Sequence, residues 1–153
     1  MTERETPRFE PRDPDYDRRL RESFARQGFM ETLGVEIARI APGAVDLVLP
    51  YKPGLTQQHG YFHAGTTTTI ADTAAGYAAL SLFPAGTGVL TSEFKVNLLN
   101  PAEGERVVAE GRVVKPGRRL TICKADVYGE KAGRPVHILT GLFTMVCLEN
   151  LDG

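Results

Sequence analysis

One carboxylate stands alone in a long uncharged stretch of this sequence. Asp72 is the only Asp, Glu, Lys or Arg between Lys52 and Glu93. Burying a bare carboxylate is costly unless a polar partner or a wet pocket compensates it, and desolvation raises its pKa above the free value of about 3.9. Such a group can serve as a general base or a nucleophile. The alternative is a structural role, in which Asp72 hydrogen-bonds a nearby hydroxyl or backbone group and shapes the chain.

The residues before this carboxylate can donate hydrogen bonds to an oxyanion. Residues 59–65 read HGYFHAG, and the small residues Ala64 and Gly65 stand where a loop is expected to become a helix. The first N–H groups of a helix have no partner inside it and bind anions. Gln57 adds a side-chain amide, and His63 is expected to order the loop. Oxyanion donors and a carboxylate about two turns further along the helix are groups that an enzyme uses to catalyse acyl transfer.

The elements that must position these groups follow from the spacing of apolar residues. Residues 15–27 repeat apolar side chains every three to four positions and predict a helix, which Gly28 ends before a second short turn or helix. Residues 64–83 predict one long helix wrapped by other structure, because both of its faces are apolar or small. Alternating patterns separated by Pro and Gly turns predict strands. These strands are residues 34–41, 44–49, 88–99, 106–114, 119–128 and 135–148.

This order of elements predicts an α+β fold, a curved antiparallel sheet wrapped around a long central helix. With 153 residues, the chain is expected to form a single domain at 15–153, after a disordered or loosely tethered tail at 1–14. The net charge of −1 offers no general attraction to nucleic acid or an anionic membrane.

Compartment and metal content are also predicted from composition. The N-terminus lacks the pattern of a signal peptide and no apolar run reaches membrane-spanning length, so a cytoplasmic location is expected. Cys123 and Cys147 lie in apolar, strand-like runs and are expected to act as small buried hydrophobes. The three histidines show no ligand spacing, so no metal is expected.

Three stretches resemble a known family. HAGTTTTIADTAAGYAAL at 63–80 resembles the helix of the hotdog-fold acyl-CoA thioesterases, close to the phenylacetic-acid-pathway thioesterase group. TSEFKVNLLNPA at 91–102 is similar to the central strand of that family, and KPGRRLTICKADVYGEKAGRPV at 115–136 is similar to the hairpin that follows. The similarity runs from about residue 30 to 148, which is most of the chain. It implies the hotdog fold, in which the sheet curls around the helix.

The resemblance implies roles for particular residues. Asp72 matches the catalytic acidic residue, and Ala64 matches the small residue whose backbone N–H polarises the thioester carbonyl, although glycine is usual there. Gln57 falls where related enzymes place Asn or Gln near that carbonyl. Thr91 falls where some members use a hydroxyl from the neighbouring subunit to hold the attacking water, and His63 would support the loop.

Candidate substrate contacts have plain structural alternatives. The resemblance implies that a turn such as the one at 115–119 can meet coenzyme A phosphates, although a solvated turn explains its charges equally well. Aromatic residues could line an acyl pocket or belong to the core, and Gly76 could leave room for substrate or for close helix packing. The candidates for substrate binding are Gly65, Phe62, Gly76, Tyr77, Lys115, Arg118 and Arg119.

The expected function is therefore acyl-CoA thioesterase, acting on a small aromatic or medium-chain acyl-CoA. The resemblance implies a homodimer or a dimer of dimers with sites at the subunit interface, and no cofactor, since coenzyme A is part of the substrate. No nucleic-acid or membrane partner is expected. Two alternatives stay open. One is a non-catalytic acyl-CoA-binding hotdog protein, and the other is a hydratase or dehydratase that pairs His63 with Asp72.

Overall fold

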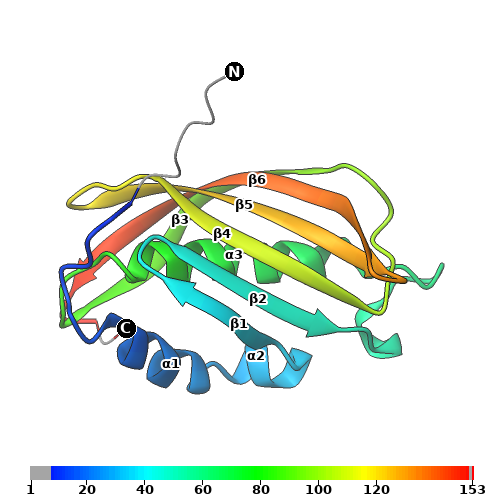
Figure 1. The fold of residues 1–153 in the computed structure, drawn as a ribbon, viewed down its shortest axis with the longest axis horizontal. Helices are drawn as coiled ribbons and strands as arrows, with labels where there is room; N and C mark the ends of the chain where they lie inside the picture. Colours follow the sequence, from blue (N-terminus) through cyan, green and yellow to red (C-terminus); the bar gives the residue numbers. More distant parts are fainter. Residues whose placement is uncertain (1–7, 152) are drawn as a thin grey trace.

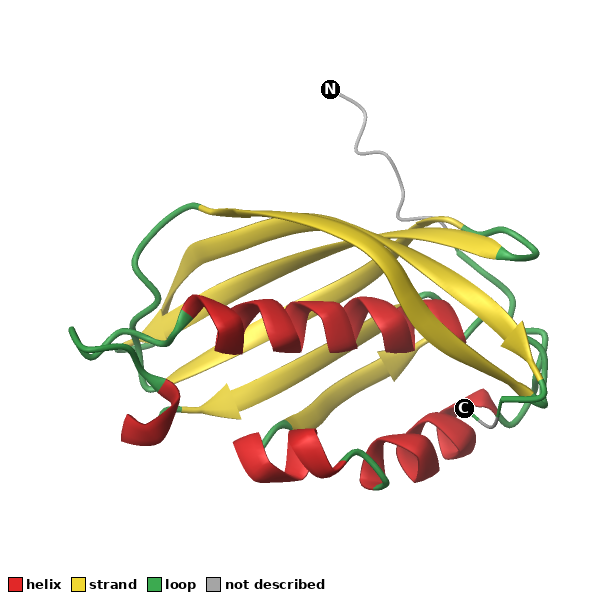
Figure 2. Ribbon diagram, turned by 180° about the vertical axis from the view of Figure 1, so that it is seen from behind, coloured by secondary structure: helices red, strands yellow, loops and turns green. Residues whose placement is uncertain are grey.

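A six-stranded antiparallel sheet curves around one long helix in the computed structural model, which describes residues 8–151 and Gly153 (Figure 1). The strands lie in the order β1-β2-β4-β5-β6-β3. Figure 2 shows α3 across one face of this sheet, with two shorter helices beside the β1 edge. The helices are α1 (Tyr16–Ala25), α2 (Gly28–Leu33), η1 (Pro53–Leu55) and α3 (Ala64–Leu80). The strands are β1 (Glu36–Ala41), β2 (Ala44–Pro50), β3 (Thr87–Leu98), β4 (Arg106–Lys115), β5 (Leu120–Lys131) and β6 (Arg134–Glu149).

The predicted sheet around a central helix is confirmed, and α3 is buried because its residues are small. Ala71, Ala74 and Ala78 have no exposed surface, and the facing strand β4 carries Gly111 at the point of contact. A methyl group at Gly111 would overlap the Ala74 carbonyl, so glycine allows the helix and the sheet to approach closely. None of the helices in the described residues is long and apolar enough to cross a membrane.

The long helix ends at Leu80, earlier than the predicted residue 83, shortly before Pro84, and α1 binds its C-terminus. The guanidinium of Arg19 donates to the carbonyls of Leu80 (3.0 Å), Phe83 (2.9 Å) and Pro84 (2.6 Å). The Leu80 carbonyl belongs to the last turn of α3, where carbonyls lack intrahelical partners, and the other two carbonyls lie just after the helix. A cation at this position also complements the helix dipole.

The segment before α1 packs on the domain, which corrects the expected loose tail for the described part of it. Asp13 is buried and pairs with Arg19 at 3.3 Å, and its carboxylate accepts the Asp15 N–H at 2.9 Å. The Phe9 ring lies against Gly43 in the β1–β2 turn. Residues 1–7 of the predicted tail lie outside the described residues. An apolar ring and a buried ion pair thus hold residues 9–13 to the domain.

Strand β3 forms one edge of the sheet and, among the described residues, pairs only with β6. Its pairing with β6 shifts register between Thr91 and Glu93. Leu90, Phe94 and Leu98 are about half exposed along this edge. A long apolar edge strand with an unpaired side is a template for pairing with another chain.

Candidate active site

The loop that precedes α3 places a histidine at the helix start. The backbone N–H of His63 donates to the Leu55 carbonyl at 2.9 Å, and its ring Nδ1 accepts the Gly65 N–H at 2.8 Å. His63 is thus the N-cap of α3, the loop-ordering role expected for it. The Gly65 N–H is occupied by this cap, and the expected substrate-binding role of Gly65 stays a prediction.

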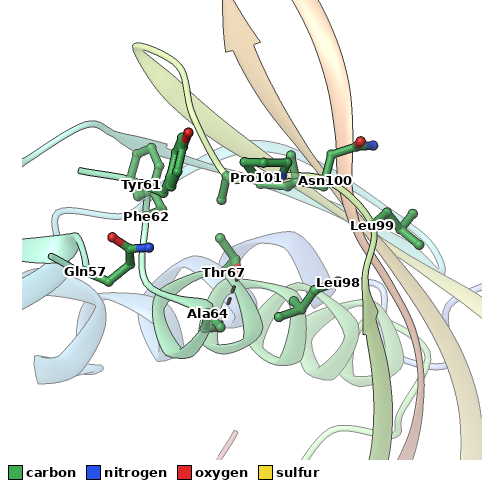
Figure 3. Close-up of a pocket in the computed structure, with 11 residues that line it drawn as sticks. Gln57, Tyr61, Phe62, Ala64, Thr67, Leu98, Leu99, Asn100 and Pro101 are labelled. Carbon is green, nitrogen blue, oxygen red and sulfur yellow. Dashed lines mark hydrogen bonds between the residues drawn. The ribbon is translucent and has the colours of Figure 1, made fainter. Parts of the chain in front are cut away.

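The free donor at the helix start is the backbone N–H of Ala64. Ala64 is the first residue of α3, so its N–H has no intrahelical acceptor, and no described residue outside the helix accepts from it. Its neighbour Gln57 lines the same pocket, of about 470 Å³, as do Phe62 and the buried Thr67 (Figure 3). The Gln57 side-chain oxygen accepts the His59 N–H, so its amide nitrogen points toward the pocket (Figure 3). Gln57 and Ala64 therefore each bring an N–H donor to the lining of one pocket.

The far wall of this pocket was missed by sequence reasoning. It is formed by the chain between β3 and β4, where the Phe62 N–H donates to the Ala102 carbonyl at 2.8 Å. The Asn-Pro turn signal at residues 100–101 marked a chain reversal but not its contact with the start of α3. The additional lining residues are Tyr61, Leu98, Leu99, Asn100, Pro101, Ala102 and Ile138.

Asp72 lies in a different pocket, of about 350 Å³, where Thr91 of the same chain donates to its carboxylate at 2.7 Å. Burial raises the pKa of the Asp72 carboxyl above its ordinary value, and the hydrogen bond from Thr91 offsets part of that rise. Within one protomer the Thr91 hydroxyl binds the Asp72 carboxylate, and its expected role in holding the attacking water stays a prediction. Thr91 pairs with the buried Met145, so it lies on the helix side of β3, just before the register shift in that strand.

The Asp72 pocket contains residues of α3, of the segment around α2 and of β3. Sequence reasoning did not connect these residues with Asp72. Helix α3 supplies threonine hydroxyl groups, and the segment around α2 supplies apolar and amide groups. The only signals were the apolar residues of that segment, which are equally typical of a core. The other lining residues are Gln27, Phe29, Met30, Thr68, Thr69, Thr73 and Phe94.

The two halves of the expected catalytic site are therefore apart within one chain. Ala64 and Asp72 are eight residues apart in a continuous helix, which separates them by about 12 Å along the axis. A reacting carbonyl needs an oxyanion donor and a base or nucleophile within about 3 Å each. One protomer cannot supply both groups to one carbonyl.

Tyr77 belongs to the core, which corrects its expected place in an acyl pocket. Its side chain is 4% exposed, and its hydroxyl bonds Ser23 and Gln27 at 3.0 Å each. The ring meets Phe24 edge-on, with centroids 5.7 Å apart. Tyr77 therefore joins α1 to α3. Its neighbour Gly76 is buried on the same helix.

Tyr77→Phe is expected to destabilise the protein without impairing catalysis. The substitution leaves Ser23 and Gln27 without their shared partner and should lower the free energy of unfolding by about 1–2 kcal/mol. Denaturant unfolding measures this loss, and kcat should stay near wild type. A kcat that falls more than tenfold in the folded variant would instead give the hydroxyl a direct part in the reaction.

Two of the three candidate phosphate ligands line a cavity at one end of the sheet. Arg118 and Arg119, in the β4–β5 turn, share a cavity of about 590 Å³ with Arg12, Cys147 and other residues, Glu149 among them. Lys115 is exposed and lies outside it. Arg12 was missed because it lies in the expected tail. The β4–β5 turn is at the opposite end of the sheet from the Gln57 loop (Figure 1).

This chain is similar to known thioesterases. A model of the thioesterase superfamily matches residues 59–136. The crystal structure of a thioesterase family protein from Silicibacter pomeroyi is 50% identical, with a TM-score of 0.87 over 88% of this chain and 98% of that chain. Acyl-coenzyme A thioesterase 13 of Homo sapiens is 26% identical over 110 residues, which are 71% of this chain and 78% of that protein.

A more distant structure extends the fold comparison. The PaaI protein from the phenylacetic acid degradation operon of E. coli is 16% identical, with a TM-score of 0.78 over 86% of this chain and 92% of that chain. At this identity the likeness concerns the fold alone. The superfamily match covers half of the sequence, and the Silicibacter pomeroyi structure covers most of it. The chain therefore belongs to the thioesterase superfamily and is a thioester hydrolase with the hotdog fold.

Proposed function

We propose that this protein hydrolyses the thioester of a small aromatic or medium-chain acyl-CoA, with Asp72 as the catalytic carboxylate. The observation that carries the proposal is the half-buried Asp72, the lone charge of its segment, held by Thr91 inside a pocket. Burial raises the pKa of Asp72, which makes the carboxylate a stronger base. The similarity to human acyl-coenzyme A thioesterase 13 supports coenzyme A as the thiol.

A second copy of the chain would complete the site. A two-fold axis at the free edge of β3 pairs it with its copy in antiparallel fashion, so the Leu98 end of one strand meets the Thr91 end of the other. This places the Ala64 N–H and Gln57 amide of one protomer near Asp72 of the partner subunit. The 12 Å separation within one helix is the physical reason for sharing the site.

The reaction then follows from the groups present. The carbonyl oxygen accepts hydrogen bonds from the Ala64 N–H and the Gln57 amide, which stabilise the oxyanion as it forms. Asp72 either takes a proton from the attacking water or attacks the carbonyl itself, giving an anhydride that water cleaves. The carbon–sulfur bond breaks, coenzyme A leaves as a thiolate, and the acid is released. A thiolate is a good leaving group and needs no strong general acid.

The hydratase alternative is less well supported within one protomer. It requires His63 to pair with Asp72, but the His63 ring caps α3 through Gly65, about two turns before the carboxylate. Its ring nitrogen Nδ1 accepts a hydrogen bond there, which leaves Nε2 as the ring nitrogen for proton transfer.

Release of free thiol from a panel of acyl-CoAs tests the proposal. Aromatic and aliphatic thioesters from two to twelve carbons, about the range of small and medium chains, are incubated with the purified protein. Turnover of one class, at a rate well above the uncatalysed one, is expected. If the protein binds acyl-CoA in calorimetry yet releases no thiol from any substrate, it is a binding protein and the proposal is wrong.

The arginine cavity is the proposed site of the coenzyme A phosphates. It includes Thr87 at the start of β3, the end that antiparallel pairing brings beside the Ala64 pocket of the second copy. Arg118 and Arg119 suit the diphosphate because a guanidinium binds phosphate oxygens through two N–H groups. Lys115 lies at the end of β4, outside the cavity. Its proposed role is only to add positive charge near the phosphates.

Arg119→Gln is expected to raise KM for acyl-CoA by about tenfold, the effect of losing one charge-assisted hydrogen bond. KM for the same acyl group on N-acetylcysteamine, which has no phosphate, should not change. Steady-state kinetics on both thioesters give the comparison. Arg134→Gln, an exposed arginine outside the cavity, is the matched control. Equal effects of Arg119→Gln on both thioesters would exclude a phosphate contact.

A further inference from the structure

Gly76 lies in the interior of α3, where glycine weakens a helix. The residue is buried, yet a methyl group built on its Cα would meet no heavy atom within 4 Å, apart from its chain neighbours and the backbone of its own helix. Steric crowding therefore does not require glycine here. The position contains empty space inside the protomer.

Gly111 on β4 shows the contrast with a packing glycine. A methyl group there would overlap the carbonyl of Ala74, on the side of α3 that faces the sheet. Gly76 is about 200° around the helix from Ala74, so it lies on the face turned away from the sheet. Because Gly76 is already buried within one protomer, close approach of a helix from a second copy does not explain it either.

The free space at Gly76 lies next to the reacting group. Gly76 follows Asp72 by four residues, so both lie on one face of α3, one turn apart. The Asp72 pocket is lined by the apolar side chains of Phe29, Met30 and Phe94 on one part of its wall, and by threonines of α3 and Gln27 on the rest. Apolar walls beside a reacting carboxylate suit the hydrocarbon part of a substrate and not its phosphates.

We infer that the acyl group extends from Asp72 along α3 toward Gly76, and that the missing side chain at Gly76 sets the length of acyl group that the enzyme accepts. The inference rests on the proposed function. The wall opposite α3 is the segment from Gln27 to Met30, which the hydrogen bond from Gln27 to Tyr77 holds in place. The hydrocarbon class that fits is a medium-length alkyl chain or an arylalkyl group.

Gly76→Ala and Gly76→Val test this inference on straight-chain acyl-CoAs and phenylacetyl-CoA. For acetyl-CoA, or the shortest substrate that the wild type hydrolyses, kcat/KM should stay within about twofold. For the longest substrate, it should fall at least about tenfold with alanine and further with valine, since each added methyl fills the space. The melting temperature of Gly76→Ala should rise by about 1–4 °C, because alanine favours the helix.

Gly54→Ala is the matched control, since Gly54 has equally open space around its Cα and lines neither pocket. It should leave the chain-length profile unchanged. An equal fall for short and long substrates would overturn the inference and give Gly76 a structural role. An active wild type whose profile does not respond to either Gly76 variant would overturn the inference alone. A wild type inert toward every thioester would contradict the proposed function as well.

Discussion

Asp72→Asn is expected to lower kcat for thioester hydrolysis by about 10²–10⁴-fold, the range for loss of a catalytic base. The amide has nearly the shape of the carboxylate and can still accept the hydrogen bond from Thr91. It can neither take a proton from water nor attack a carbonyl. Thiol release at saturating substrate measures the loss, while circular dichroism and gel filtration check the fold and the oligomeric state. Undiminished turnover would show that the lone aspartate is structural.

The pH dependence of wild-type turnover provides a second test of the same carboxylate. The ionised form of Asp72 is the active one, and burial raises its pKa. Activity should therefore decline, as pH falls, at a higher pH than an exposed aspartate would give. Thr91→Val removes the hydrogen bond that favours the ionised form, so its acid limb should move to still higher pH. A limb that does not move in this variant would separate Thr91 from the catalytic group.

The raised pKa of Asp72 also predicts a lower free energy of unfolding at neutral pH. Because the pKa of Asp72 is higher in the folded state than in the unfolded state, ionisation opposes folding. This penalty is present in full above the folded pKa and absent below the unfolded one. Asp72→Asn should therefore melt at a higher temperature than the wild type at neutral pH. The difference in melting temperature should shrink as pH falls through the folded and then the unfolded pKa of Asp72. Melting curves over that range give the comparison.

Ala64→Pro is expected to lower kcat by about 10²–10³-fold, the effect of removing one oxyanion donor. Proline lacks the N–H group but is tolerated at the first position of a helix, where no intrahelical bond is lost. The preceding residue, His63, already has the extended backbone that proline requires, with φ −62° and ψ 141°. The melting temperature should consequently stay near that of the wild type.

Ala64→Gly is the matched control, because it changes the side chain and keeps the donor. Its kcat should stay within about threefold of wild type, as expected when the backbone N–H is the functional group. If the proline variant keeps full activity, the oxyanion donor lies elsewhere. If both variants lose activity equally, the Ala64 methyl group matters and the N–H does not.

Mixing the two inactive variants tests whether the site is shared. In a heterodimer of Ala64→Pro and Asp72→Asn, one site combines both lesions and the other combines both intact groups. Random pairing of refolded subunits should restore about a quarter of wild-type activity. Native mass spectrometry confirms that heterodimers form. No recovery in a sample that contains them would place the whole site within one protomer.

The sequence by itself determined the elements and the catalytic candidates. The long helix and the six strands follow from apolar periodicity and from Pro and Gly turns, which act over a few neighbouring residues. The isolation of Asp72 in an uncharged segment is likewise a local fact. The position of Ala64 at the first turn of α3 follows from the change in pattern after His63.

Only the tertiary structure decided which side chains meet. The hydrogen bond between Thr91 and Asp72 depends on how β3 lies beside α3, and the bonds of Tyr77 to Ser23 and Gln27 depend on how α1 packs on α3. These pairs are distant in the chain, and their contacts arise from register and packing, which no local pattern encodes. The same holds for the separation of Ala64 from Asp72. It becomes a physical constraint only once both are known to lie on one rigid helix, and it is the reason for a site shared between two copies.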